Sequence, residues 1–290
     1  MPNLMRRATV ALTGVAIVAN VLAAGGPALA ASSPQAEAFE SGNWAGYYTV
    51  ADAPIHGATG LFTVPSVSCR NSRGVKPYYG SMWVGIGGMG STGNSIDPGG
   101  PAWLEQAGVN VTCSSLNAKP QYELFWEVVP APGEGNPCSS GYDGSFGNAH
   151  VQAGDSVRVM IDPPTRSPKP GYWYFWVAAS SSSVPWEKYV KLPNGVYTGQ
   201  TVEVITEYPT AVNNACRAIP SGFVDLGTVH YTNAVYLAGG LQTGISMLTN
   251  RIDLYHNGSL AVSPGEPYTS ETSSADNDSF NTYYAKNWWR

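Results

Sequence analysis

The chain of 290 residues is sparsely charged, with 15 Lys and Arg against 20 Asp and Glu and a formal net charge of −5. An acidic chain of this kind is a poor partner for nucleic acid or for an anionic membrane surface, so we expect it to bind neither. The abundant Gly, Ser, Thr, Asn and aromatic residues are typical of β proteins that work outside the cell.

The first thirty residues have the three parts of a secretory signal peptide. Arg6 and Arg7 supply the positive start, residues 8–24 form an uncharged apolar run, and residues 28–30 read Ala-Leu-Ala, a small-x-small cleavage pattern. The apolar run is at the lower limit for a membrane span, and the cleavage pattern follows it closely. The sequence therefore predicts a cleaved signal and a secreted, extracellular protein with no membrane association after cleavage.

We expect residues 31–41 to form a short polar lead and residues 42–290 to form one domain. The domain is filled with short runs rich in Val, Ile, Tyr, Phe, Trp and Thr, and no stretch keeps a helical period over three turns. The predicted strands are Trp44–Val50, Ala58–Val64, Tyr79–Ile86, Trp103–Val111, Gln121–Val129, Ser156–Ile161, Tyr172–Ala178, Thr201–Tyr208, Val224–Val235 and Ile252–Tyr255. Many short strands between turn signals predict an all-β fold, a two-sheet antiparallel β-sandwich.

The sequence also predicts two loops and a last strand. Ser180–Ser183 should be a surface loop within the domain, and Ser270–Ser279 should be a mobile loop. The aromatic end, with Tyr283-Tyr284 and Trp288-Trp289, should pack back as a last strand.

The cysteines are scattered and form no C-x-x-C motif, which disfavours a zinc site. They are Cys69, Cys113, Cys138 and Cys216. In an oxidising compartment they predict two disulfides, and all three pairings remain open. Since the four histidines form no metal-binding motif either, we expect no metal and no other cofactor.

Two strands carry carboxylates on one face. Residues two apart in a strand share a face, so Glu123, Phe125 and Glu127 lie together, opposite an apolar face. In the same way Glu203, Ile205 and Glu207 share a face. A solvated outer sheet is the simplest explanation. However, Phe125 and Ile205 are unusual on such a face, and the Tyr and Trp around both segments favour a groove for a chain-like ligand.

The order of motifs resembles that of the glutamic peptidases (eqolisins) of the scytalidoglutamic type. The segment Leu104-Glu105-Gln106-Ala107-Gly108 is similar to the family's Ile-Leu-Gln-Thr-Gly, which holds its catalytic Gln. The segment Val202-Glu203-Val204-Ile205-Thr206-Glu207 is similar to Ala-Glu-Phe-Ile-Ile-Glu, whose last Glu is catalytic. Further similar segments are Asn43-Trp44-Ala45-Gly46, Val64-Pro65, Trp83-Val84-Gly85-Ile86, Tyr122-Glu123-Leu124-Phe125-Trp126-Glu127, Gly154-Asp155-Ser156 and Thr232-Asn233-Ala234.

The resemblance implies a jelly roll of the concanavalin A type and a secreted acid endopeptidase, which we expect to be a monomer acting on polypeptides. It implies that Gln106 and Glu207 are the catalytic pair. Glu207 would take a proton from water, and the Gln106 amide would orient that water and donate to the developing oxyanion. Such a site works in acid if the pKa of Glu207 stays low. The substrate-binding residues implied are Trp44, Trp83, Glu123, Phe125, Glu127 and Glu203.

Two departures leave other functions open. Gly87 stands where the family has Asp after Trp-Val-Gly-Ile, and Asn110 stands where it has an acid. The alternatives are a concanavalin-like glycoside hydrolase and a non-catalytic β-sandwich that binds carbohydrate or peptide. For the hydrolase, Glu123 and Glu127 are about 13 Å apart on a regular strand, beyond the roughly 5–9.5 Å of glycosidase pairs, so a bulge would be required.

The lead before Asn43 also carries an expectation. Fungal members of the family place a long basic prosegment before the enzyme, whereas this lead is short and poor in Lys and Arg. We therefore expect export of a mature domain that needs no zymogen removal.

Overall fold

The computed structural model describes residues 39–51, 53–88, 103–129, 143–147, 149–192, 201–209, 220–244, 249–256, 259–265 and 278–284. The chain divides into two compact units, Met1–Gln35 and Ala36–Arg290, and every described residue belongs to the second. No helix within the described ranges is long and apolar enough to cross a membrane.

The described part of the chain is made of strands, with one short 3₁₀ helix (η1, Cys69–Asn71). The strands are β1 (Phe39–Ser41), β2 (Trp44–Val50), β3 (Ile55–Thr63), β4 (Tyr78–Gly87), β5 (Leu104–Cys113), β6 (Gln121–Val129), β7 (Asp143–Ser145), β8 (Ser156–Asp162), β9 (Trp173–Ala179), β10 (Trp186–Val190), β11 (Thr201–Glu207), β12 (Gly222–Phe223), β13 (Thr228–Ala238), β14 (Leu241–Gly244), β15 (Thr249–His256), β16 (Ser259–Pro264) and β17 (Phe280–Tyr284).

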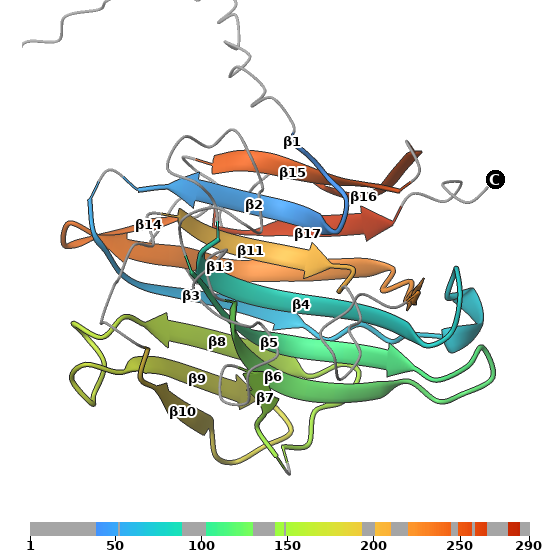
Figure 1. Ribbon diagram of the computed structural model, residues 1–290, viewed down its shortest axis with the longest axis horizontal. Helices are drawn as coiled ribbons and strands as arrows, with labels where there is room; N and C mark the ends of the chain where they lie inside the picture. Colours follow the sequence, from blue (N-terminus) through green and yellow to red (C-terminus); the bar gives the residue numbers. More distant parts are fainter. Residues whose placement is uncertain are drawn as a thin grey trace, which may run out of the picture. The chain divides into compact units, whose positions relative to one another are not determined.

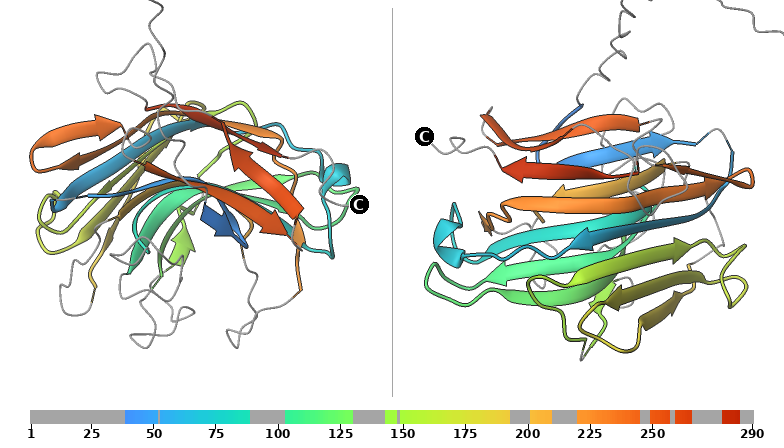
Figure 2. Two further views of the ribbon diagram at one scale, coloured as in Figure 1. Left: turned by 90° about the horizontal axis from the view of Figure 1, so that it is seen from above. Right: turned by 180° about the vertical axis from the view of Figure 1, so that it is seen from behind.

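The strands form two layers, which Figure 1 shows from the front and Figure 2 from above and behind. The first sheet runs β7-β6-β5-β4-β11-β2-β15, with every pair antiparallel. The second sheet runs β10-β9-β8-β3-β13-β17 and is also antiparallel. Strand β16 pairs with both β15 and β17 and so joins the layers along one side. The predicted all-β sandwich is confirmed.

Alternation along the strands builds the core between the layers. Met82, Val84 and Ile86 of β4 face the second sheet, where Val157 and Val159 of β8 point back at them. Residues of the two sheets also meet as ring pairs, with Trp126 and Phe175 at 6.1 Å between centroids and Tyr47 and Phe280 at 4.9 Å. Burial of this apolar area, at about 25 cal/mol per Å², is the main force that holds the layers together.

The other face of the first sheet points away from the second sheet. It carries a separate apolar cluster of seven buried residues, namely Trp44, Tyr48, Trp83, Leu104, Phe125, Ile205 and Ile252. Figure 2 shows that both layers curve in the same sense, with this face on the concave side. We call it the cleft face. Apolar residues on it explain why β2, β4, β5 and β11 read as nearly continuous buried runs.

Two glycines let large rings settle on the cleft face. A Cβ on Gly85 would come within 2.8 Å of the Trp83 ring, and one on Gly108 would come within 2.0 Å of the Met82 carbonyl oxygen. Neither position has room for a side chain. Glycine therefore lets β4 and β5 approach closely beneath the Trp83 indole, which meets Trp44 edge-on at 5.1 Å.

Two of the sequence motifs meet in a turn of the second sheet. The Val64 N–H donates to the Asp155 carbonyl oxygen and the Gly154 N–H donates to the Val64 carbonyl oxygen, both at 2.8 Å. The buried Asp155 carboxylate accepts from the hydroxyls of Ser180 and Ser181, at 3.1 and 2.6 Å. The Ser180–Ser183 run begins the connection from β9 to β10 within the domain, so its role is to close this turn around Asp155.

Several strands differ from the predictions. The polar lead contains β1, which pairs in parallel with β15, so the sheet already begins at Phe39. The predicted strand Val224–Val235 starts at Thr228 instead. Strands β7, β10, β14 and β16 were not predicted, because they are short or polar and depend on pairing with neighbours. The last strand is confirmed at Tyr283-Tyr284, whereas Trp288-Trp289 lie outside the described residues.

One disulfide is present in the described part of the chain. Cys69 of η1 and Cys113 at the end of β5 are bonded, at a sequence separation of 44. The bond fastens the loop before β4 to the far end of β5. Cys138 and Cys216 lie outside the described residues, as does most of Ser270–Ser279, of which Asp278 and Ser279 are described and fully buried.

Candidate active site

The cleft face places the polar residues of the predicted site in two rows across the first sheet. One row follows the register Glu203, Gly85, Gln106, Glu127 and Asp143, from β11 through β4, β5 and β6 to β7. The other row follows Glu207, Ser81, Asn110 and Glu123. Antiparallel pairing, which the sequence does not state, thus brings two distant carboxylate-bearing strands onto one surface.

Gln106 is held by Glu127. The Gln106 Nε2 donates to Glu127 Oε2 at 2.6 Å, a short bond of the kind made to a charged acceptor. The Gln106 side chain is almost fully buried, with 4% exposure, and its Oε1 has no hydrogen-bond partner among the described residues. Because an ionised carboxylate can only accept, the bond fixes which end of the amide faces Glu127 and leaves Oε1 directed elsewhere.

Glu207 is held by three side chains that donate to it. The Trp83 indole Nε1 donates to Oε2 at 2.6 Å, the Ser81 hydroxyl donates to Oε2 at 3.5 Å, and the Asn43 amide donates to Oε1 at 3.2 Å. The Trp44 indole also favours the ionised form, although its Nε1 makes no hydrogen bond of good geometry. The carboxyl at the end of β11 is therefore positioned by β2, β4 and the residue before β2.

The pKa of Glu207 is raised to about 7. Burial is the largest cause, the negative charge of Glu127 adds to it, and the donors from Trp83, Trp44 and Ser81 oppose it. The low pKa of Glu207 that work in acid would require is therefore not found here. Glu127 itself has a raised pKa, through burial and the nearby Asp143, offset by the bond from Gln106. Both carboxyls thus hold their protons more tightly than free glutamate does.

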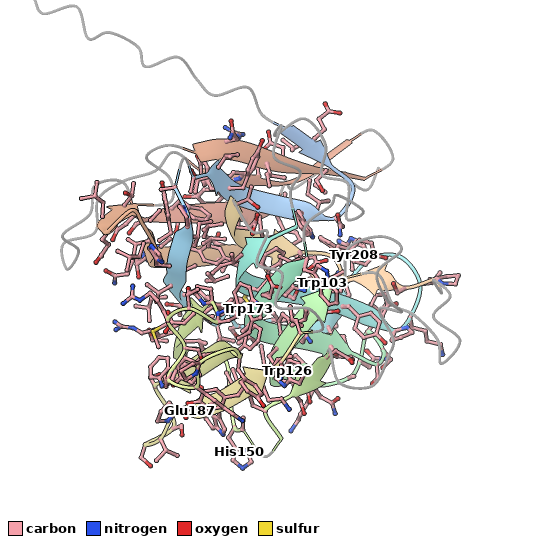
Figure 3. The ribbon with its side chains drawn as sticks, turned by 60° about the vertical axis from the view of Figure 1, so that its left-hand side comes forward. Trp103, Trp126, His150, Trp173, Glu187 and Tyr208 are labelled. Carbon is pink, nitrogen blue, oxygen red and sulfur yellow. A yellow bond between two sulfur atoms is a disulfide. The ribbon has the colours of Figure 1, made fainter. Side chains whose placement is uncertain are left out.

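Gln106 and Glu207 share no hydrogen bond within the described structure. They stand on β5 and β11 with β4 between them, and their β4 partners, Gly85 and Ser81, are four residues apart. The connection between them is Glu127, which accepts from Gln106 and whose charge is felt by Glu207. Figure 3 labels Trp103, just before β5, and Tyr208, just after β11, well away from Glu187 on β10.

The predicted substrate-binding residues separate by burial. Trp44, Trp83 and Phe125 are buried in the cleft cluster, where they form the floor beneath the carboxylates. Glu123 is exposed and Glu127 is half-buried. Glu203 is wholly buried, with 0% exposure. Its neighbour on the same face, Ile205, covers the sheet between the two acids of β11.

A cavity of about 320 Å³ opens at the β6–β7 side of the cleft face. Its lining is Asn110, Glu123, Phe125, Trp126, Glu127, Asp143, Gly144 and Ser145. It contains Glu127, the hydrogen-bond partner of Gln106, whereas neither Gln106 nor Glu207 lines it. A larger hollow, of about 470 Å³, lies on the outer face of the second sheet against Met160 and Trp176 and includes none of the predicted site residues.

Three residues of the site were not singled out from the sequence. Asn43 belongs to a quoted motif, yet its bond to Glu207 spans 164 residues. The sequence does indicate Ser81, because it lies two residues before Trp83 in the strand and so shares its face. Nothing in the sequence indicates Asp143, since β7 is a three-residue edge strand whose place depends on pairing with β6.

Comparisons with known proteins agree with this arrangement. The Peptidase A4 family model matches residues 42–281. Aspergillopepsin-2 from Aspergillus niger is 26% identical over 235 residues, which cover 76% of this chain and 72% of that protein. Scytalido-glutamic peptidase, solved with a transition state analog inhibitor, has a TM-score of 0.59 at 14% identity, covering 84% of this chain and 99% of that one.

A second solved structure is SCP-B, an eqolisin in a complex with the tripeptide Ala-Ile-His, with a TM-score of 0.55 at 14% identity over 84% of this chain and 99% of that one. At such identity these structures show a shared β-sandwich fold. The match of the family model over most of the chain goes further. This chain belongs to the Peptidase A4 family, the glutamic peptidases or eqolisins.

Proposed function

We propose that the chain is a secreted endopeptidase that hydrolyses polypeptides with a water molecule activated by Glu207 and oriented by Gln106. The observation that carries this proposal is the fixed Gln106 amide. Its Nε2 is bound to Glu127 at 2.6 Å and its Oε1 is buried without a partner among the described residues. An amide in this state offers one acceptor and one remaining N–H to a reacting group.

In the proposed reaction, ionised Glu207 takes a proton from water as the water oxygen bonds to the scissile carbonyl carbon. The carbonyl π electrons move to its oxygen, and the free N–H of Gln106 donates to that oxyanion. The neutral Glu207 then passes the proton to the leaving nitrogen as the C–N bond breaks. Trp83, Ser81 and Asn43 hold the carboxylate for both proton transfers.

The pH dependence follows from the need for an ionised base. With a pKa of about 7, most of Glu207 is protonated in acid. Activity on free enzyme should therefore fall as the pH drops below about 7, by up to tenfold per unit. The family resemblance implies activity in strong acid. Such activity requires that bound substrate lower the pKa of Glu207.

The test is cleavage of denatured casein by the purified chain from pH 3 to 8, in the presence of pepstatin. We expect Glu207→Gln and Gln106→Ala each to lower kcat by at least about 100-fold, the usual scale for loss of an acid–base group or an oxyanion donor. Glu187→Gln, a change of an exposed acid on β10, is the control. Unchanged cleavage in both site variants would overturn the dyad, and binding without any turnover would favour the non-catalytic module.

The structure lacks the feature that the glycoside hydrolase alternative requires. It needs a bulge in β6 to bring Glu123 and Glu127 together, but β6 pairs with β5 in an unbroken register from Gln121 to Val129. Family membership likewise places the chain among peptidases.

A further inference from the structure

A serine at the end of β1 lies beside one of the groups that donate to Glu207. Ser41 is the last residue of β1, which pairs in parallel with β15, and two residues separate it from β2 (Figure 1). Its side chain is nearly buried, with 6% exposure. The Peptidase A4 model begins to match one residue later, and none of the sequence motifs includes Ser41.

The Ser41 hydroxyl makes three hydrogen bonds with the two residues around the start of β2. Its Oγ accepts from the backbone N–H of Asn43 at 3.3 Å and from that of Trp44 at 3.0 Å, and its O–H donates to Asn43 Oδ1 at 3.2 Å. A hydroxyl has two acceptor lone pairs and one proton. Because backbone donors occupy both lone pairs, the proton is what remains for the Asn43 side chain, and only the oxygen end of that amide can accept it.

This bond decides which end of the Asn43 amide meets Glu207. With Oδ1 held by Ser41, Nδ2 is turned to Glu207 Oε1 and donates to it at 3.2 Å. The backbone is tied to the same place, because the Tyr208 N–H, directly after Glu207, donates to the Asn43 carbonyl oxygen at 2.8 Å. A half-turn of the amide group is therefore the freedom that remains, and the Ser41 hydroxyl opposes it.

The two orientations of the amide favour different protonation states of Glu207. After a half-turn, Asn43 Oδ1 would face Glu207 Oε1. Two acceptors repel each other when Glu207 is ionised, whereas a protonated carboxyl can donate to Oδ1. An N–H toward Glu207 thus favours the ionised base, and a C=O toward it favours the acid. This difference matters because burial already raises the pKa of Glu207 to about 7.

We propose that Ser41 is a positioning residue for the reaction, because its hydroxyl locks the Asn43 amide with an N–H toward Glu207 and so favours the ionised base. The inference rests on the proposed function, in which Glu207 is that base. Ser41 touches no reacting atom and acts through Asn43.

Acids of β6 and β11 share the cleft face with Glu207. The negative charge of Glu127 on β6 helps to raise the pKa of Glu207. Glu123 ends the row that runs from Glu207 across β4 and β5, and Glu203 is buried four residues earlier on β11. Within the described structure these three acids make no hydrogen bond to Ser41 or Asn43. Their effects on Glu207 should be the same with and without the Ser41 hydroxyl.

The remaining groups at Glu207 are neutral donors. Trp83 and Ser81 on β4 donate to Oε2 and make no contact with Ser41. Trp44 on β2 lies opposite Glu207, its indole favours the ionised form, and its backbone N–H is bound to Ser41. A test of the proposal must therefore separate an effect through Asn43 from one through Trp44.

The experiment measures the pKa of Glu207 in the full chain by ¹³C NMR of glutamate-labelled protein, with the carboxyl signal assigned by its absence in Glu207→Gln. Ser41→Ala removes the hydroxyl, and we expect the pKa of Glu207 to rise by at least about 0.5 unit. Ser41→Thr keeps a hydroxyl and suits a strand, so it should restore the wild-type value. Glu40→Gln changes the exposed neighbour in β1 and removes a negative charge, so it should not raise this pKa.

A double-mutant cycle separates the two routes. Asn43→Ala removes the amide that Ser41 orients and leaves the Trp44 N–H in place. If Ser41 acts through Asn43, Ser41→Ala should shift the pKa of Glu207 in the wild-type background and leave it unchanged, within about 0.1 unit, in the Asn43→Ala background. An equal shift in both backgrounds would overturn the proposal, because Ser41 would then act through Trp44 or through β1 as a whole.

Kinetics distinguishes failure of this proposal from failure of the proposed function. With Glu207 as the base, the acid limb of kcat/KM in Ser41→Ala should move to higher pH by the shift that NMR measures, and a mere loss of stability would not move it. If Glu207→Gln keeps full activity, the proposed function fails, and the NMR titrations still decide whether Ser41 orients Asn43.

A readout on the wild type covers the case in which Ser41→Ala does not fold. The side-chain amide signals of Asn43 in ¹H–¹⁵N spectra, assigned by their loss in Asn43→Ala, should titrate with the pKa of Glu207 because Nδ2 donates to its carboxyl. Amide signals that do not follow the Glu207 titration would overturn the proposal. So would a folded Ser41→Ala protein with the wild-type pKa of Glu207.

Discussion

The Gln106 amide on β5 donates a 2.6 Å hydrogen bond to the Glu127 carboxylate on β6, and the charge of that carboxylate raises the pKa of Glu207 on β11. One side chain therefore acts on both members of the proposed dyad. It fixes the orientation of the amide, and it sets how readily the base gives up its proton. These two effects can be separated by mutation.

Glu127→Gln and Glu127→Ala should differ in a defined way. Gln keeps an acceptor for Gln106 and removes the charge, so the pKa of Glu207 should fall and the acid limb of kcat/KM should move to lower pH. Ala removes the acceptor too, which frees the amide, and we expect a further loss in kcat of about tenfold or more. Steady-state kinetics from pH 3 to 8 measure both. The same acid limb in Glu127→Gln and wild type would contradict the electrostatic coupling.

The donor with the shorter hydrogen bond to Glu207 should have the larger effect on its pKa. Trp83→Phe removes the 2.6 Å bond while keeping a ring against Trp44, and Ser81→Ala removes the 3.5 Å contact. Since each donor favours the ionised form, its loss should raise the pKa of Glu207 and move the acid limb to higher pH. We expect a clearly larger shift for Trp83→Phe than for Ser81→Ala. The reverse order would show that the indole acts by packing alone.

The Cys69–Cys113 bond should contribute measurably to stability. It closes a loop of 44 residues, for which the chain-entropy model gives about 4 kcal/mol. The double variant Cys69→Ser/Cys113→Ser avoids a lone thiol and should lower the free energy of unfolding by about that amount in urea titration. A change below about 1 kcal/mol would mean that the bond is not formed in the folded protein.

The alternation of polar and apolar residues along the sequence was sufficient to predict several features of this chain. The β6 segment was delimited correctly at both ends, because alternation of Glu123, Phe125 and Glu127 with apolar residues marks a strand with two different faces. The same reasoning placed Glu203, Ile205 and Glu207 on one face of β11. Motif order then identified the family, and with it the candidate pair Gln106 and Glu207.

Features that depend on pairing between distant strands were decided only by the tertiary structure. Glu203 and Glu207 share a strand and a face, yet one is sealed between β2 and β4 while the other is held by indole and amide donors from β4 and the residue before β2. Likewise four cysteines allow three pairings, and the fold selected Cys69 with Cys113. The physical reason is that alternation fixes the face of each residue, whereas register and sheet order fix its neighbours, and neighbours determine burial, hydrogen bonding and charge.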